Sequence, residues 1–127
     1  MAFETKIGDH TLLMDAAEEN GGDNNGPRPK LLLMAALAGC TGMDVVSILK
    51  KMRVEIESFE LQVEGELTEE HPKHYKNMHL VYVFKGKNLP LDKLEKAVNL
   101  SQDQYCGVSA SYKKAMQVTY EIKIEEQ

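Results

Sequence analysis

The sequence lacks several features that would assign it to a large class of proteins. Its formal net charge is -5, so basic residues are not in excess and nucleic acid is not its expected partner. Its longest apolar run, Leu31 to Met43, is shorter than the roughly 20 residues that cross a bilayer, which predicts a core helix and no membrane partner. The N-terminus has no basic region followed by an apolar stretch and a cleavage site, and this predicts a cytoplasmic location.

Cysteine is also scarce, with two copies in the chain. Cys40 and Cys106 are 66 positions apart, and in a cytosolic chain of this size such a pair is more typical of free or redox-active thiols than of a structural disulfide. Cys40 is surrounded by apolar and small residues, so its ordinary interpretation is a small buried residue. Cys106 lies at a predicted junction of two helices, where the ordinary role is packing and the functional one is a reactive thiolate.

The length of 127 residues predicts a single domain over residues 1–127. Near its start, the segments Phe3 to Ile7 and Thr11 to Asp15 predict two short strands around a turn. The next segment, Glu19 to Pro27, is dense in glycine and asparagine, which indicates an exposed loop. Its glycines are too loosely spaced to predict a phosphate-binding loop.

A buried helix is predicted from Leu31 to Leu49, because this segment is rich in leucine, alanine and methionine. Gly39 and Gly42 flank the first cysteine, and a bend or a break of the helix is expected there. Asp44 follows Cys40 by four positions, so the helical spacing places both side chains on the more polar face.

Two strands are predicted after this helix. From Glu57 the apolar period changes to two, which predicts a half-buried strand with an acidic outer face. Its inward residues are expected to be Phe59, Leu61, Val63 and Leu67. The next strand, His79 to Gly86, is apolar on both faces and should be covered on both sides. The histidines at positions 71, 74 and 79 fit no compact ligand motif, so no metal site is predicted.

The last third of the chain predicts two helices and a strand. Pro90 is expected to open a helix that ends near Cys106, with Gly107 as its C-terminal glycine. Ser109 is expected to cap a further helix, and Val118 to Ile124 alternate as a final strand. This order of elements predicts an α+β fold with a mainly antiparallel sheet. The buried face of the first of these helices is predicted to be Leu91, Leu94, Ala97, Val98, Ser101 and Tyr105.

Two blocks of the sequence resemble the OsmC/Ohr family, the osmotically induced and organic-hydroperoxide-resistance proteins. Gly26 to Arg53, GPRPKLLLMAALAGCTGMDVVSILKKMR, is similar to the family's Pro-led helix with its first cysteine. Leu100 to Ile124, LSQDQYCGVSASYKKAMQVTYEIKI, is similar to its second-cysteine block. The form GCTGMDVVSILKKM looks closest to an OsmC-like branch of the family, and the first strand that most relatives carry is expected to be missing.

The resemblance implies an interwoven homodimer whose sheets wrap around central helices, with both cysteines brought together near the subunit interface. It implies thiol-dependent reduction of organic hydroperoxides, with Cys40 as the peroxidatic cysteine and Cys106 as the resolving one. No metal, flavin or other cofactor is required. An external thiol reductant, such as the dithiol of a lipoyl group, would reduce the resulting disulfide.

Active family members usually pair an arginine with a glutamate upstream of the first cysteine, and this pair is absent here. Supporting charge near the thiols is instead expected from Lys6, Arg28, Lys30 and Asp44. An apolar pocket for the alkyl group of the substrate is expected from Leu33, Leu37 and Met43.

Two functions from different classes stay open at this point. The pair of cysteines favours a thiol peroxidase. The missing arginine and glutamate favour a degenerate family member that binds a small apolar ligand and has little or no peroxidase activity. A peroxide-consumption assay with several thiol donors distinguishes between them.

Overall fold

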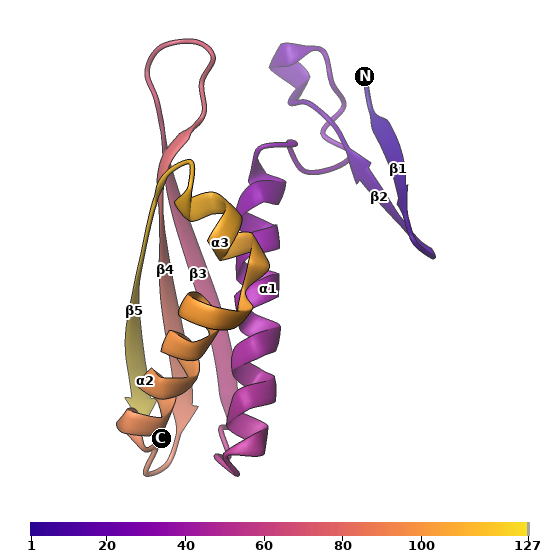
Figure 1. Ribbon diagram of the computed structural model, residues 1–127. Coiled ribbons are helices and arrows are strands. Elements are labelled where there is room, and N and C mark those ends of the chain that lie inside the picture. The colour runs from indigo at the N-terminus through magenta and orange to yellow at the C-terminus, as the bar shows by residue number, and fades with distance from the viewer. Residues whose placement is uncertain (127) are drawn as a thin grey trace. The chain divides into compact units, whose positions relative to one another are not determined.

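The computed structural model describes residues 1–126, in which two compact units are recognised: Met1–Ala35 and the chain from Ala36 onward. The first unit contains an antiparallel hairpin of β1 (Phe3–Ile7) and β2 (His10–Met14) (Figure 1). Both predicted strands are confirmed, the second beginning one residue earlier than expected. The organisation of residues 1–127 as one domain stays a prediction.

The loop after β2 is organised by the buried carboxylate of Asp15. This carboxylate accepts hydrogen bonds from the backbone N–H groups of Ala16 at 2.7 Å and of Asp23 and Asn25 at 3.1 Å each. These donors, that of Asn25 above all, hold the pKa of Asp15 below its ordinary value. The loop, which also contains the short 3₁₀ turn η1 (Glu18–Asn20), therefore has a defined internal anchor.

Helix α1 (Leu31–Lys51) is continuous, so a break at its glycines, one of the two predicted outcomes, is wrong. Gly42 instead permits close packing, because a Cβ atom there would lie 3.0 Å from Cδ1 of Leu61. With 21 residues, α1 is long and apolar enough to cross a membrane by length and composition alone, a test that the core helix of a soluble protein also passes. One stripe of the helix is buried, as expected of a core helix, and consists of Leu37, Thr41, Val45 and Leu49.

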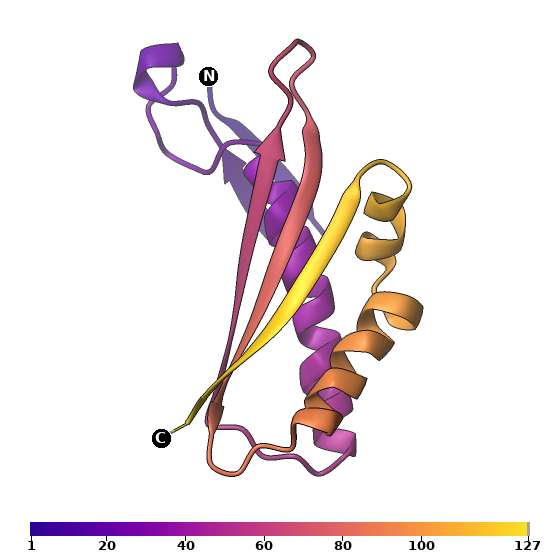
Figure 2. The same cartoon turned by 90° about the vertical axis from the view of Figure 1, so that its left-hand side faces the viewer.

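The second unit contains a three-stranded sheet in the order β3 (Ser58–Leu67), β4 (Tyr75–Gly86), β5 (Gln117–Glu126). β3 pairs with β4 in antiparallel fashion, whereas β5 runs parallel to β4. The helical segments between β4 and β5 provide the long crossover that parallel pairing requires. The helices lie on one face of this sheet, as Figures 1 and 2 show, and the predicted α+β class is confirmed.

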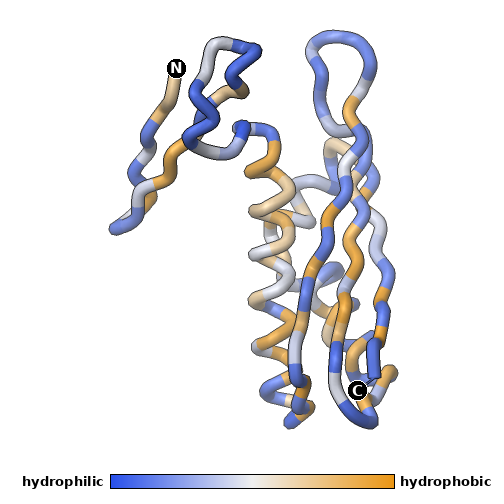
Figure 3. Tube along the Cα trace, turned by 180° about the vertical axis from the view of Figure 1, so that it is seen from behind, coloured by the Kyte–Doolittle hydropathy of each residue, from blue (hydrophilic) through white to orange (hydrophobic). Residues whose placement is uncertain are grey.

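The central strand β4 is covered on both faces, as predicted. Leu80, Tyr82 and Phe84 are completely buried on the helix side, and Val81 and Val83 are buried on the other side. The strand is flanked on the second side by polar residues of β3 and β5. In Figure 3 the polar colours gather in the loop that joins β3 to β4.

The inward direction predicted for Leu67 is wrong. The alternation of β3 buries Phe59, Leu61 and Val63 partly, but the pairing with β4 shifts between Glu66 and Leu67. Such an irregularity breaks the period of two. Leu67 is therefore exposed at the end of the strand.

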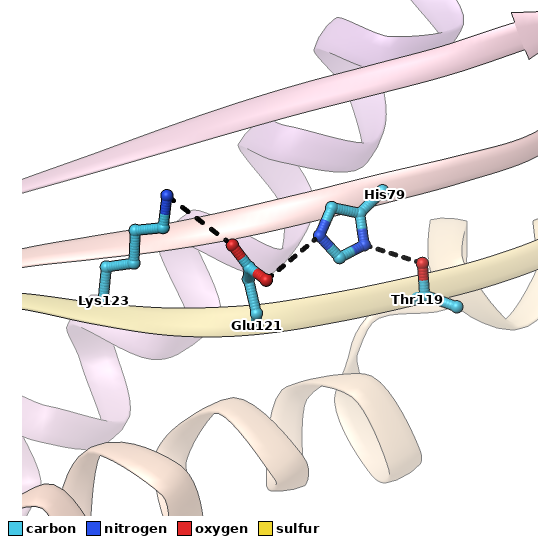
Figure 4. A network of polar contacts seen from close by, with 4 residues as sticks. All are labelled: His79, Thr119, Glu121 and Lys123. Atoms are coloured by element: carbon cyan, nitrogen blue, oxygen red, sulfur yellow. Dashed lines mark hydrogen bonds and ion pairs between the residues drawn. The ribbon is translucent and has the colours of Figure 1, made fainter.

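The face of the sheet opposite the helices carries a chain of exposed polar contacts (Figure 4). His79 Nδ1 lies 2.7 Å from Thr119 Oγ1, and His79 Nε2 lies 3.7 Å from a carboxylate oxygen of Glu121. The second oxygen of Glu121 lies 3.7 Å from Nζ of Lys123. Exposed pairs of this kind contribute little to stability. Among the described residues, no histidine belongs to a cluster of potential metal ligands.

The helical crossover differs from the prediction at its second half. Pro90 is the N-cap of α2 (Leu91–Leu100), which continues into a π-helical turn, η2 (Ser101–Tyr105). Helix α3 (Gly107–Lys113) follows, with Cys106 as its N-cap. Gly107 is therefore the first residue of a helix and not a C-terminal glycine, and the predicted cap at Ser109 is wrong.

The π turn also changes which side chains are buried. Leu94, Ala97, Val98 and Ser101 are buried as predicted, but Tyr105 is 60% exposed and Gln102 is buried in its place. A π turn adds one residue to the helical period, so residues after it no longer follow the stripe that precedes it. Leu91, at the other end of the predicted face, is also exposed.

Candidate active site

Two thiols from distant parts of the chain meet in the second unit. Cys40 is half-buried in the middle of α1, and Cys106 is buried between η2 and α3. Both are free thiols, and their sulfur atoms lie within 4.8 Å of one another. The prediction that these side chains approach one another is confirmed. A disulfide bond of about 2.0 Å would require only a modest further approach of the two sulfurs.

The backbone around Cys106 positions this thiol through two hydrogen bonds. The N–H of Cys106 donates to the carbonyl of Ser101 at 2.7 Å and so closes the π turn. The Sγ atom accepts from the N–H of Ser109 at 3.3 Å, as the cap of α3. Because π turns recur at functional sites, this local departure from the α-helix is consistent with a functional role for Cys106.

The surroundings of Cys106 disfavour its thiolate form. Burial is the main cause that raises the pKa of Cys106, to about 11, and the hydrogen bond from Ser109 opposes it. The neighbouring thiol of Cys40 and the carboxylate of Asp44 add to the rise. Cys106 is therefore protonated at neutral pH.

Asp44 completes a cluster with the two thiols. It lies one helical turn after Cys40, and a carboxylate oxygen of Asp44 is within 4.8 Å of both sulfur atoms. Its negative charge opposes ionisation of Cys106, so it does not replace the arginine of the family pattern. Two thiols and a carboxylate this close are also donors that a thiophilic cation such as Zn²⁺ can use.

A chain of buried hydroxyl groups ends at the Asp44 carboxylate. Ser101 Oγ donates to Asp44 Oδ2 at 2.9 Å, and Thr41 Oγ1 lies 2.7 Å from Ser101 Oγ. Tyr82 OH lies 2.7 Å from Thr41 Oγ1 and accepts a hydrogen bond from Nε2 of Gln102 at 2.7 Å. These contacts connect α1, β4 and η2 around the thiols.

Sequence reasoning identified only part of this arrangement. It placed Ser101 on the buried face of a helix, and a buried hydroxyl group requires a hydrogen-bond partner. That signal did not identify its partners, Thr41 and Asp44, because both lie on α1, far from Ser101 in the sequence. The residues missed are Thr41, Tyr82, Gln102 and Ser109, whose hydroxyl donates to Oε1 of Gln102 at 2.6 Å.

The other predicted site residues lie in different parts of the chain. Leu37 is completely buried in the second unit, whereas Met43 is 77% exposed there. Lys6, Arg28, Lys30 and Leu33 belong to the first unit, and their participation in the site stays a prediction. In that unit Arg28 donates to the Oδ1 atom of Asn24 at 2.8 Å and to the carbonyl of Gly26 at 3.0 Å.

Two grooves run along α1 in the second unit. The first, of about 630 Å³ and mostly apolar, is lined by residues of α1 and β3: Gly39, Gly42, Met43, Val46, Ser47, Lys50, Phe59 and Leu61. The second, of about 560 Å³, contains Asp44 and two lysines, and its lining is Asp44, Ser47, Ile48, Lys51, Met52, Lys96, Leu100 and Tyr105. One groove thus offers apolar contacts close in sequence to Cys40, and the other reaches Asp44.

Comparisons with known proteins agree with this geometry. The chain matches a family model described as OsmC-like protein over residues 22–121. It is 33% identical to Protein YhfA of Escherichia coli strain K12 over 115 residues, which are 91% of this chain and 83% of that protein. A hypothetical protein from Aquifex aeolicus VF5 has a similar crystal structure, with a TM-score of 0.81 and 32% identity over 98% of this chain and 89% of that one. The organic hydroperoxide resistance protein OhrB of Bacillus subtilis shares the fold, with a TM-score of 0.64 and 19% identity over 97% of this chain and 96% of that one.

Proposed function

Because the chain belongs to the OsmC-like family, we propose that it is a thiol-dependent peroxidase that reduces organic hydroperoxides. The observation that carries the proposal is the approach of the Cys40 and Cys106 sulfurs to within 4.8 Å. The name of OhrB, whose fold is similar, supports the same class of substrate. An external thiol, such as a dithiol of the lipoyl type, would complete the cycle, and the cytoplasm is the expected location.

The two thiols receive different roles from their surroundings. Cys40 is the attacking residue, since it is half-buried, while Cys106 is 3% exposed and protonated at neutral pH. The Cys40 thiolate attacks the O–O bond, becomes a sulfenic acid and releases an alcohol. Cys106 then condenses with the sulfenic acid to give a disulfide and water.

The apolar groove between α1 and β3 supports a preference for bulky alkyl hydroperoxides. Its lining includes Gly39, which precedes Cys40 in the sequence, and its apolar side chains include Met43, Phe59 and Leu61. Removing an alkyl group from water stabilises the bound substrate by about 25 cal/mol per Å² of apolar surface. Cumyl hydroperoxide should therefore react faster than hydrogen peroxide.

We expect this enzyme to be a homodimer. Several large apolar side chains of α1 are exposed, among them Met43 and Val46 in the groove described above. A second copy would cover this apolar surface and close the groove.

The proposed roles predict different outcomes for the two cysteine variants. With one equivalent of cumyl hydroperoxide, Cys40→Ser should consume no peroxide, because a serine hydroxyl is not an adequate nucleophile at neutral pH. Cys106→Ser should still consume one equivalent and then accumulate sulfenic or sulfinic acid at Cys40. Peroxide consumption and mass spectrometry of the oxidised peptides measure both outcomes. Oxidation of Cys106 while Cys40 stays reduced would contradict these roles.

A second candidate function is the binding of a small apolar ligand. The specific observation in its favour is the negative charge of Asp44 beside both thiols, which disfavours a thiolate at Cys106. The first unit also contains an apolar hollow of about 430 Å³ whose lining includes Met1, Phe3 and Met14. Wild-type protein that leaves excess cumyl hydroperoxide unconsumed, yet binds cumyl alcohol in calorimetry, would favour this function over the peroxidase.

A further inference from the structure

We propose that Asp44 is the acid–base residue of the resolving step, in which Cys106 attacks the sulfenic acid of Cys40. The inference rests on the proposed function, because that function supplies the sulfenic acid. It concerns the second half of the cycle and assigns a catalytic role to a carboxylate that the arginine–glutamate pattern of the family does not contain.

The position of Asp44 suits both proton transfers of this step. One of its carboxylate oxygens lies within 4.8 Å of the Cys106 sulfur, which must lose a proton, and of the Cys40 sulfur, which carries the leaving oxygen. Asp44 and Cys40 are one turn apart on the continuous helix α1, so their separation is fixed by the helix itself. Asp44 is only half-buried and also lines a groove, so its carboxylate is within reach of solvent.

The buried hydroxyl chain holds this carboxylate in one orientation. Ser101 has one hydroxyl proton and donates it to Asp44, so in its contact with Thr41 the Ser101 oxygen must be the acceptor. Thr41 must in turn accept from Tyr82, whose oxygen accepts from the amide of Gln102. Every donor therefore points toward the carboxylate, and a chain of this kind polarises each hydrogen bond in the same direction.

Cys106 needs a base at this point of the cycle. It is buried and protonated at neutral pH, and the thiolate is the form that attacks sulfur. As the S–S bond forms, the Asp44 carboxylate takes the proton from the Cys106 sulfur. The S–O bond of Cys40 breaks with both electrons on oxygen, and Asp44 returns the proton to the departing hydroxide as water. The Cys106 sulfur is oxidised, the Cys40 sulfur is reduced, and Asp44 ends as the carboxylate it was at the start.

The test measures the two half-reactions separately in rapid-mixing experiments. One equivalent of cumyl hydroperoxide oxidises the reduced protein, dimedone traps the sulfenic acid, and quenched samples report disulfide formation. In Asp44→Asn the sulfenic acid should still form, but the disulfide step should slow about 100-fold, within the range that a general base contributes. The matched control is Asp103→Asn, which removes the same charge from an exposed residue of η2 and should resolve at the wild-type rate.

The pH dependence separates an acid–base role from a structural one. Without its base, Cys106 attacks only as free thiolate, so the Asp44→Asn rate should rise about tenfold per pH unit up to the Cys106 pKa of the variant. That pKa lies below the wild-type value of about 11, because the Asp44 charge that helps to raise it is gone. The difference in the rate of disulfide formation between Asp44→Asn and wild type should therefore become smaller as the pH rises. A variant that was merely distorted would stay slow at every pH. The charged or titratable groups that face Asp44 are Cys40, Cys106, Lys51, Lys96, Tyr105 and, through the hydroxyl chain, Tyr82.

An experiment without peroxide tests the role of Asp44 independently of the proposed peroxidase function. Ellman's reagent places a thionitrobenzoate disulfide on Cys40, and attack by Cys106 releases the second thionitrobenzoate anion, whose colour reports the same step. Cys106→Ser should release a single anion. Slow release of the second anion in Asp44→Asn would support the role of Asp44 as the base, even if the wild-type protein consumed no peroxide. A failure to consume peroxide would overturn only the proposed peroxidase function.

Ser101→Ala provides a second variant in case Asp44→Asn fails to fold. It removes the donor that orients the Asp44 carboxylate but leaves the carboxylate itself, so resolution should slow about tenfold. Resolution at the wild-type rate and with the wild-type pH profile in either variant would overturn the inference.

Discussion

At the scale of single residues, the burial of Cys106 affects the stability of the fold as well as its chemistry. A thiol that is protonated when folded, yet titrates near its ordinary value when unfolded, couples folding to pH. The coupling arises mainly from removal of the Cys106 sulfur from water, and Asp44 and Cys40 increase it. Cys40, half-buried on α1, has no comparable shielding from solvent.

This coupling predicts a loss of stability at high pH. Below the ordinary thiol pKa of 9.0, folded and unfolded chains both hold the Cys106 proton, so this residue adds no pH dependence. Between pH 9.0 and about 11 the unfolded chain loses this proton first, and the free energy of unfolding should fall by roughly 3 kcal/mol across the window. Urea denaturation of wild type and Cys106→Ala over this range measures the effect. Parallel pH profiles for the two proteins would contradict it.

The reactive residues themselves were recognisable in the sequence, but their partners were not. The blocks around Cys40 and Cys106 resemble one family closely enough to pair the two thiols on the strength of the sequence alone, and their proximity is confirmed. The hydrogen bond from Ser101 to Asp44 joins residues 57 positions apart. Local periodicity carries no information about a pairing of that kind, so Asp44 was expected only as a supporting charge.

At the scale of elements, the π turn η2 explains both the site and the failed predictions around it. A strict helical period would carry the buried stripe from Ser101 on to Tyr105. The wider turn exposes Tyr105, buries Gln102, and leaves Cys106 at the start of α3, where it caps the helix with its sulfur. Gly107 follows this junction as a helical residue, although a glycine in such a place usually predicts a helix end. The additional residue of a π turn does not change the apolar pattern of the sequence in a recognisable way, so the turn was not predicted.

The hydroxyl chain connects α1 to β4 and η2, so its loss should destabilise the second unit. In Thr41→Val the hydroxyls of Tyr82 and Ser101 lose their shared partner inside the core. Buried polar groups without a partner cost about 1–3 kcal/mol, and the free energy of unfolding should fall by that amount. The measurement is urea denaturation followed by circular dichroism.

Thr119→Val is the matched control for this variant. Thr119 makes its hydrogen bond to His79 on the exposed face of the sheet, where water can replace the partner. Its substitution should change stability by less than about 0.5 kcal/mol. Equal effects of the two threonine variants would mean that the buried chain has no special contribution to stability.

At the scale of the whole molecule, the sequence predicted the α+β class and most of the elements but not all of the pairing. The alternation of β3 and β5 was recognisable because each strand has one polar face. The parallel pairing of β5 with β4 was not predicted, because alternation identifies a strand and says nothing of its direction. Membership of the OsmC-like family confirms the resemblance drawn from the two cysteine blocks.

The distribution of apolar residues on α1 predicts the state of the molecule in solution. The helix is apolar over most of its length, yet its buried stripe leaves Met43 77% and Val46 49% exposed beside Phe59 and Leu61. A contiguous apolar surface of this kind is normally covered by a partner, and a second copy of the chain covers it most simply through a two-fold interface.

We therefore expect a dimer mass by multi-angle light scattering at micromolar concentration, and we expect Val46→Glu to weaken the dimer. The new carboxylate would lose its water at the interface, a penalty of several kcal/mol that Lys50, one turn later on α1, offsets only in part. A net cost of about 3 kcal/mol corresponds to a rise of roughly 100-fold in the dimer dissociation constant. Gln62→Glu is the control, because it adds the same charge to the exposed face of β3 opposite the helices and should leave the dimer intact. A wild-type monomer, or a Val46→Glu protein that stays as dimeric as Gln62→Glu, would show that this face of α1 is not the interface.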